Sequence, residues 1–214
     1  MFKRFALTLA LIYASTYGQA QSKMETIASM SIIADFVRQI GGERVNVTTL
    51  VAAGGDAHTF QPAPQDARRV AQAKLVFING LGLEGWLPRL VQSSGSKARI
   101  ITVSQGVQAI RDTSDADGHS HAHDLDPHAW QNVANAKIYI RNIAQALSAA
   151  DAEGAPTYAA RADAYLAELD RLDADIRAGL ATIPPERRRI ITSHDAFGYF
   201  AKAYGMNFIA PQGV

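Results

Sequence analysis

The residues of this 214-residue chain best suited to chemistry are its six histidines, because the sequence contains no cysteine. Without thiols the chain can form no disulfide, thiolate metal site, iron–sulfur cluster or cysteine nucleophile. A metal ion could be held only by histidine, aspartate, glutamate or water. Three histidines stand in separate local contexts: His58 in GGDAHTFQP, His128 in DPHAW and His194 in TSHDAF.

The three histidines follow predicted strands. His58 lies a few residues past a strand predicted over residues 45–51, His194 ends a strand predicted over 188–194, and His128 follows the long loop after the fourth strand. In an open parallel sheet, ligands bind beyond the carboxyl ends of the strands. A single histidine is more often an ordinary surface or core residue. Three at such positions predict a shared metal site.

The chemistry of three imidazoles favours zinc. An aspartate lies within two residues of each histidine and could accept the second ring N–H, as is usual for ligating imidazoles. A helix predicted over residues 195–205 would keep the His194 ring neutral through the positive charge at its amino end. Three neutral rings bring no negative charge, so we expect a carboxylate as fourth ligand. This donor set suits Zn²⁺ better than Mn²⁺ or Mg²⁺, and Cu²⁺ stays an alternative.

Three further histidines, His119, His121 and His123, alternate in GHSHAHD within an Asp-rich stretch over residues 111–126. Alternate side chains of an extended segment point the same way. The stretch is therefore either an accessory, exposed metal-gathering tract or a solvated spacer. Five aromatic residues near the motifs are interpreted as core or cleft-wall packing: Phe60, Trp86, Trp130, Phe197 and Tyr199.

The elements that must position these residues alternate between strand and helix. Apolar, β-branched runs alternate with segments of helical periodicity in the first half of the chain. Strands that are apolar on both faces and separated by helices indicate a parallel sheet covered on both sides. The predicted strands span residues 24–31, 45–51, 74–80 and 98–104, and the predicted helices span 31–42 and 64–73.

The second half of the chain predicts a long connecting helix. After a helix over about 131–150, apolar residues recur every three or four positions over 156–181, a rod of ~39 Å. A strand (188–194), a helix (195–205) and a strand (206–212) follow. We expect an α/β protein with two parallel-sheet lobes joined by a long rigid helix, the second lobe incomplete at Val214. The expected domains are an N-terminal lobe (21–152), a linking helix (153–184) and the start of a C-terminal lobe (185–214).

Residues 1–20 resemble a secretory signal. Lys3 and Arg4 precede an apolar run over 5–14, and Gly18-Gln19-Ala20 fits the small-x-small cleavage pattern. With no cysteine to accept a lipid, we expect a soluble periplasmic protein. The near balance of 21 basic and 20 acidic residues argues against nucleic acid as a partner.

Taken together, GGDAHTFQP, DPHAW, the long helix and TSHDAFGYFAKAYG resemble the zinc/manganese substrate-binding proteins of ABC importers, the ZnuA-like family. The resemblance covers residues 24–214. It implies a metal held between two lobes and delivered to a membrane permease. We expect a monomer that is not an enzyme. The resemblance matches His58 and His128 to the two ligands of the first lobe. It matches His194 to the third ligand, which is His in zinc-type and commonly Glu in manganese-type members. It places an acidic fourth ligand beyond Val214.

Two other functions fit the same residues. A periplasmic zinc buffer or chaperone would use mainly the histidine tract. A zinc hydrolase would also need three protein ligands and an open position. The sequence contains neither HExxH nor GxSxG, which argues against the hydrolase.

Overall fold

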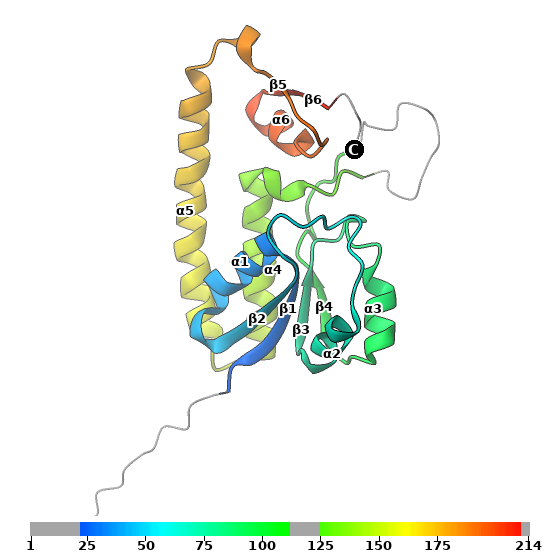
Figure 1. Cartoon of the computed structure of the whole chain (residues 1–214). Coiled ribbons are helices and arrows are strands. Elements are labelled where there is room, and N and C mark those ends of the chain that lie inside the picture. The colour runs from blue at the N-terminus through cyan, green and yellow to red at the C-terminus, as the bar shows by residue number, and fades with distance from the viewer. Residues whose placement is uncertain (1–21, 112–124, 211–214) are drawn as a thin grey trace, which may run out of the picture.

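The computed structural model describes residues 22–111 and 125–210. Four parallel strands form the larger sheet in the order β2-β1-β3-β4 (Figure 1). They are β1 (Met24–Met30), β2 (Val45–Val51), β3 (Leu75–Ile78) and β4 (Arg99–Thr102). Since every pairing is parallel, the carboxyl ends of all four strands lie at one edge of the sheet.

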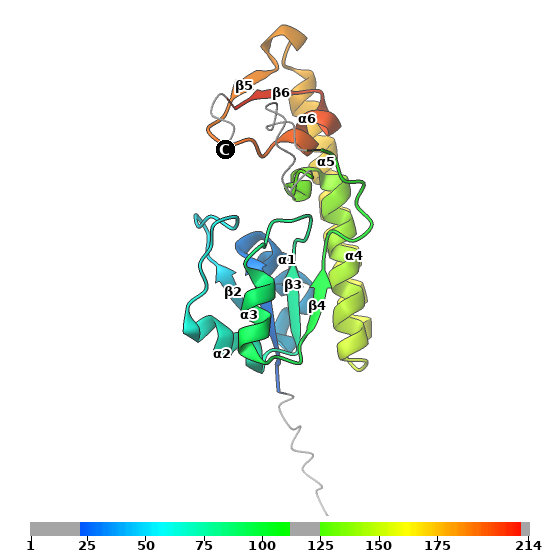
Figure 2. The same ribbon diagram turned by 90° about the vertical axis from the view of Figure 1, so that its right-hand side faces the viewer.

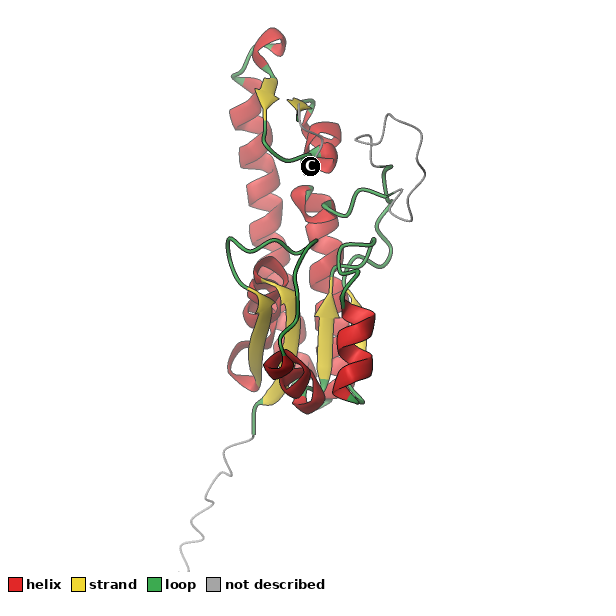
Figure 3. Ribbon diagram, turned by 45° about the vertical axis from the view of Figure 1, so that its right-hand side comes forward, coloured by secondary structure: helices red, strands yellow, loops and turns green. Residues whose placement is uncertain are grey.

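Helices cover both faces of this sheet (Figure 3). Alternate strand residues point to opposite sides, so that Ala28 and Phe77 join one core while Ile27 and Val76 join the other. The first core is closed by α1 (Ser31–Gly41), α4 (Val133–Ala150) and α5 (Ala155–Ala181), and the second by α2 (Pro64–Gln72) and α3 (Leu87–Ser94). The predicted α/β class and covered parallel sheet are confirmed.

Two details differ from the sequence prediction. Strand β4 lies at the edge of the sheet, where Ile100 is 45% exposed, so this strand is not buried on both faces. Helix α3 was not predicted at all. Pro88 near its start and Gly95 in the left-handed conformation at its end are the signals that mark it.

Helix α5 is the predicted rod. Its 27 residues extend about 40 Å, from the lower end of the larger sheet past α4 to the smaller sheet (Figures 1 and 2). Its buried side chains, Tyr158, Ala162 and Leu169, join the first core, whereas Leu172 farther along is 47% exposed. The first part of α5 therefore belongs to the larger unit, and the remainder extends beyond it.

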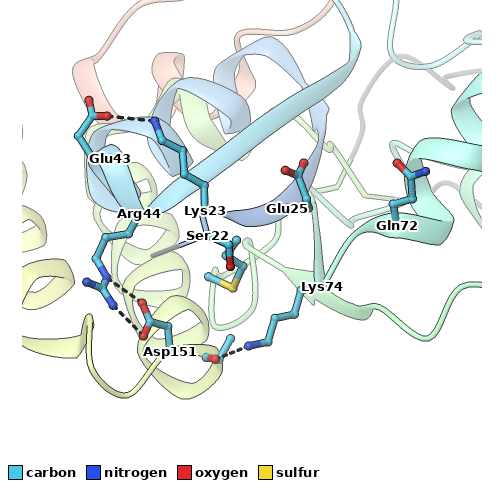
Figure 4. Close-up of a pocket in the computed structure, with 10 residues that line it drawn as sticks. Ser22, Lys23, Glu25, Glu43, Arg44, Gln72, Lys74 and Asp151 are labelled. Carbon is cyan, nitrogen blue, oxygen red and sulfur yellow. Dashed lines mark hydrogen bonds and ion pairs between the residues drawn. The ribbon is translucent and has the colours of Figure 1, made fainter. Parts of the chain in front are cut away.

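Hydrogen bonds fix the turn from which α5 departs, and Figure 4 shows those between Arg44 and Asp151. Arg44, in the 3-10 turn η1 (Gly42–Arg44), donates to both carboxylate oxygens of Asp151 at 2.8 and 3.1 Å. The Tyr158 hydroxyl and the Gly154 N–H donate to the same carboxylate at 2.7 and 3.1 Å. Hydrogen bonding from Arg44 holds the pKa of Asp151 well below its usual range. These contacts, which border a pocket at the amino-terminal edge of the sheet, set the direction of α5.

The smaller unit contains β5 (Arg189–Ile191), α6 (Gly198–Tyr204) and β6 (Asn207–Ile209), with the 3-10 turn η3 (Pro185–Arg187) before it. Its two strands are parallel. Phe197 stacks on Phe208 with ring centroids 4.7 Å apart, and the Tyr204 hydroxyl donates to Asp173 of α5 at 2.8 Å. The predicted second parallel sheet is therefore present, attached to the far part of α5.

Candidate metal centre

Three histidines from distant parts of the chain meet between the two units. His58 lies in the loop after β2, His128 immediately precedes the 3-10 turn η2 (Ala129–Gln131), and His194 lies in the loop after β5. His58 is exposed, His128 is buried and His194 is intermediate. Within the described ranges, these three form the one group of histidines and acids placed to share a metal ion.

The ring nitrogens are close enough for one ion. The Nε2 atom of His128 lies 3.2 Å from that of His58 and 3.1 Å from that of His194. Potential ligand atoms of all three residues lie within 4.8 Å of one another. Two Zn–N bonds of ~2.05 Å at the tetrahedral angle would place their nitrogens ~3.3 Å apart. The spacing thus suits three imidazoles around a single cation.

Asp126 orients the central ring. Its Oδ1 atom lies 2.8 Å from His128 Nδ1 and accepts the backbone N–H of His128 at 2.8 Å. Both residues are buried. When His128 Nδ1 donates to this carboxylate, the lone pair of the ring is on Nε2 and faces the other two histidines. A single lone pair cannot accept two good hydrogen bonds, whereas one cation would satisfy all three nitrogens.

The loop that carries His58 is closed by hydrogen bonds. Asp56 accepts the backbone N–H of His58 at 2.8 Å and the hydroxyl of Thr59 at 2.6 Å. The bond from Thr59 contributes most to lowering the pKa of Asp56. Beside His58 is a small pocket whose other lining residues come from two segments: Leu81, Gly82, Leu83, Gly85, Leu125 and Pro127.

His194 does not lie at the amino end of a helix, contrary to the prediction. Strand β5 ends at Ile191, so His194 lies beyond the strand rather than at its end. Helix α6 begins at Gly198, four residues after His194, and not at about Asp195. The field of a helix terminus acts within its first turn. The amino end of α6 therefore does not explain a neutral His194 ring.

Several residues that support the site were not found from the sequence. The Asn79 side chain donates to the Pro127 carbonyl at 2.9 Å and accepts the Tyr139 hydroxyl at 2.6 Å. Burial raises the pKa of Tyr139, which keeps this hydroxyl protonated. Of the aromatic residues expected to pack, Trp86 also donates Nε1–H to the Ala57 carbonyl at 2.8 Å. These three hydrogen bonds join residues that are 29 to 60 positions apart in the sequence, so no local sequence pattern reveals them.

The Tyr199 hydroxyl forms hydrogen bonds at both ends of the Asp-rich stretch. Its hydroxyl accepts the Ile110 N–H at 3.2 Å and donates to the Asp126 carbonyl at 3.0 Å. The Asp126 N–H donates to the Ile110 carbonyl at 2.9 Å, and Arg111 and Leu125 form an antiparallel bridge. The smaller unit thus contacts the segment that carries the buried histidine. His119, His121 and His123 lie outside the described residues, as does the predicted signal over 1–20.

The chain is similar to solved structures of periplasmic metal-binding proteins. The chain superposes on the Mn-bound periplasmic metal binding protein from Candidatus Liberibacter asiaticus with a TM-score of 0.76 at 33% identity, covering 87% of this chain and 68% of that one. It superposes on a structure described as ZnuA with a TM-score of 0.77 at 29% identity, covering 88% of this chain and 70% of that one.

The family described as "Zinc-uptake complex component A periplasmic" matches residues 27–214, and the chain belongs to it. This is a family of substrate-binding proteins rather than enzymes, as the sequence predicted. No helix in the described part of the chain has the length and apolar character needed to cross a bilayer.

Curated relatives carry both general and manganese-specific names. The metal ABC transporter substrate-binding lipoprotein ScbA of Streptococcus cristatus is 37% identical over 198 residues, which are 90% of this chain and 63% of the relative. The manganese-binding lipoprotein MntA of Halalkalibacterium halodurans is 38% identical over 186 residues, 87% of this chain and 59% of the relative. The chain thus spans about three fifths of the length of these relatives. Their names do not favour zinc.

Proposed function

We propose that this protein is an extracytoplasmic substrate-binding protein that captures a divalent metal ion and delivers it to the membrane permease of an ABC importer. The observation that carries the proposal is the convergence of His58, His128 and His194, with Nε2 separations of 3.2 and 3.1 Å. Membership of the family supports the transport role. In this proposal the ion is cargo, bound and released without chemical change.

We further propose zinc as the preferred cargo. The three side chains supply imidazole nitrogen, which suits zinc, whereas manganese favours more oxygen ligands. Manganese remains the competing cargo because of the names of the relatives. The lobes expected over residues 21–152 and 185–214, joined by a helix over 153–184, would place this site at their junction.

The test is a competition titration of the whole chain against a chromophoric chelator, with Zn²⁺ and Mn²⁺ measured separately. The variants are His58→Ala, His128→Ala and His194→Ala. Loss of a residue that only hydrogen-bonds to a metal ligand lowers affinity by ~10–100-fold. Each of these variants removes a ligand itself and should lower zinc affinity by at least that much. A chain in which His119, His121 and His123 are all replaced by Ala should retain tight binding.

Each outcome has a clear meaning. Zinc binding that is lost only when His119, His121 and His123 are replaced would refute the site formed by His58, His128 and His194 and would favour the buffer function. Tighter binding of Mn²⁺ than of Zn²⁺ by the unmodified chain would refute the zinc preference while leaving metal capture intact.

A further inference from the structure

One turn contacts both loops that carry histidines of the first unit. Residues 79–86 follow β3 and bond at each end to the residue immediately before a histidine. Trp86 Nε1–H donates to the carbonyl of Ala57 at 2.8 Å, next to the exposed histidine. Asn79 Nδ2–H donates to the carbonyl of Pro127 at 2.9 Å, next to the buried one. The turn therefore joins the loop of His58 to the segment of His128.

The backbone of the turn adopts an unusual conformation. Gly80, Leu81 and Gly82 have φ values of 80°, 54° and 85°. Positive φ is common for glycine but rare for leucine, so this conformation needs support from its surroundings. A Cβ atom on Gly80 would also lie 2.5 Å from the Thr102 side chain. The turn is held in place by contacts and does not form from local preference alone.

The buried carboxylate of Glu84 supplies that support. It accepts the backbone N–H of Asn79 at 2.7 Å and that of Gly80 at 3.0 Å. It also accepts the hydroxyl of Ser29 at 2.6 Å, at the carboxyl end of β1. Glu84 is only 6% exposed. Its two oxygens thus join the start of the turn to β1, one of the two inner strands of the sheet.

We propose that Glu84 is a positioning residue that sets the separation of His58 and His128 by holding the turn over residues 79–86. Glu84 acts through the turn and is not a ligand of the ion. The inference rests on the proposed function for its metal readout, and a second readout below requires no metal.

Glu84→Gln is the informative variant, because all three partners of the carboxylate are donors. Oε1 accepts from Ser29 and Asn79, and Oε2 accepts from Gly80. A glutamine has one acceptor oxygen and one NH₂ group of similar shape. In either orientation of the amide, one backbone N–H, that of Asn79 or that of Gly80, then faces an NH₂ donor. The turn must move to relieve this contact.

Asp66→Asn is the matched control. Asp66 is likewise buried, at 5% exposed, and accepts the backbone N–H of Ala63 at the start of α2. It also forms an ion pair with Arg69. Replacing it removes a buried carboxylate that supports the backbone of a different segment. The control therefore measures the effect of general destabilisation.

The first experiment uses Co²⁺ as a spectroscopic probe and Zn²⁺ competition in the whole chain. Glu84→Gln should change the cobalt d–d spectrum and weaken zinc binding about tenfold, the lower end of the range for outer partners of metal ligands. Asp66→Asn should leave both unchanged. An unaltered cobalt spectrum in a folded Glu84→Gln chain, or equal changes in both variants, would overturn the proposal.

The second experiment uses the metal-free chain. The ring resonances of His58 and His128 in NMR spectra should shift in Glu84→Gln and stay fixed in Asp66→Asn. If Glu84→Gln does not fold, Trp86→Phe keeps an aromatic ring beside Phe60 but removes the bond to the Ala57 carbonyl, and it should shift the His58 resonance. Unshifted resonances would overturn the positioning role whether or not metal binds. Absence of metal binding by the unmodified chain, with shifted resonances, would overturn the proposed function alone.

Discussion

Replacing Asp126 by Asn tests how much metal affinity depends on the orientation of the His128 ring. The carboxylate accepts two hydrogen bonds from His128, from Nδ1 and from the backbone N–H, each at 2.8 Å. Both side chains are less than 10% exposed, at 7% for His128 and 9% for Asp126. Water therefore cannot readily replace a lost bond. A neutral amide would accept more weakly and would make Nε2 a poorer ligand.

The expected loss follows from the supporting role of this residue. Outer partners of metal ligands contribute about 10–100-fold to affinity, equivalent to about 1.4–2.7 kcal/mol. Glycine at position 198 leaves room for Oδ2, since a Cβ atom there would lie 2.6 Å from it. Because both side chains of the pair are buried, water cannot restore the interaction that the amide loses. We expect a loss toward the upper part of the range.

The assay is zinc competition at pH 7.5 with Asp126→Asn, the unmodified chain and Asp66→Asn. Asp66 caps α2 and provides the control for loss of a buried carboxylate. Urea unfolding of each variant would separate loss of affinity from loss of structure. A folded Asp126→Asn chain that binds zinc within about twofold of the unmodified chain would refute the assigned role of this carboxylate.

Three further predictions concern pH and the base of α5. Zinc affinity should fall below pH ~6, because metal binding requires neutral imidazoles with an ordinary pKa of ~6.5, and a flat profile from pH 5 to 7.5 would contradict histidine ligation. Gly154→Ala should destabilise the chain by about 1–3 kcal/mol in urea unfolding. The reason is that its Cβ would lie 2.4 Å from both Arg44 Nε and Asp151 Oδ2, and unchanged stability would contradict this packing. Asp151→Asn should lose stability at pH 7. Because Arg44 depresses the folded-state pKa of Asp151, that contribution is fully present above the unfolded pKa of ~3.9 and is lost progressively at lower pH. Unfolding curves of the two chains should therefore converge in acid, and a constant difference would refute the assignment.

Periodic segments were predicted well because their signal is local. The strand predicted over 45–51 is β2 with the same bounds, and the helix predicted over 156–181 is α5 with one residue added. The short helix α6 was placed three residues too early, since Asp195, Ala196 and Phe197 extend its apparent pattern without joining it. Eight-residue α3 was missed although Pro88 near its start and Gly95 at its end mark its bounds.

For the candidate site, the sequence predicted which histidines would meet but not what holds them. The histidines could be found because parallel topology brings the ends of strands together. Asp126 could be anticipated as a partner because it lies two residues from His128. Asn79 bonds to Pro127, 48 positions away, and Glu84 bonds to Ser29, 55 positions away, and no local pattern encodes these two contacts.

Residues 110 and 126 are hydrogen-bonded to each other, which makes the segment between them useful for protein engineering. Their backbone groups bond directly at 2.9 Å, and Tyr199 joins both from the other unit. The two ends of the intervening insert thus meet at a fixed point, and the entropic cost of lengthening a closed loop grows only slowly. A fluorescent reporter grafted between these ends would lie two residues from His128 in the sequence. Metal binding at the three histidines could then be read as an optical signal.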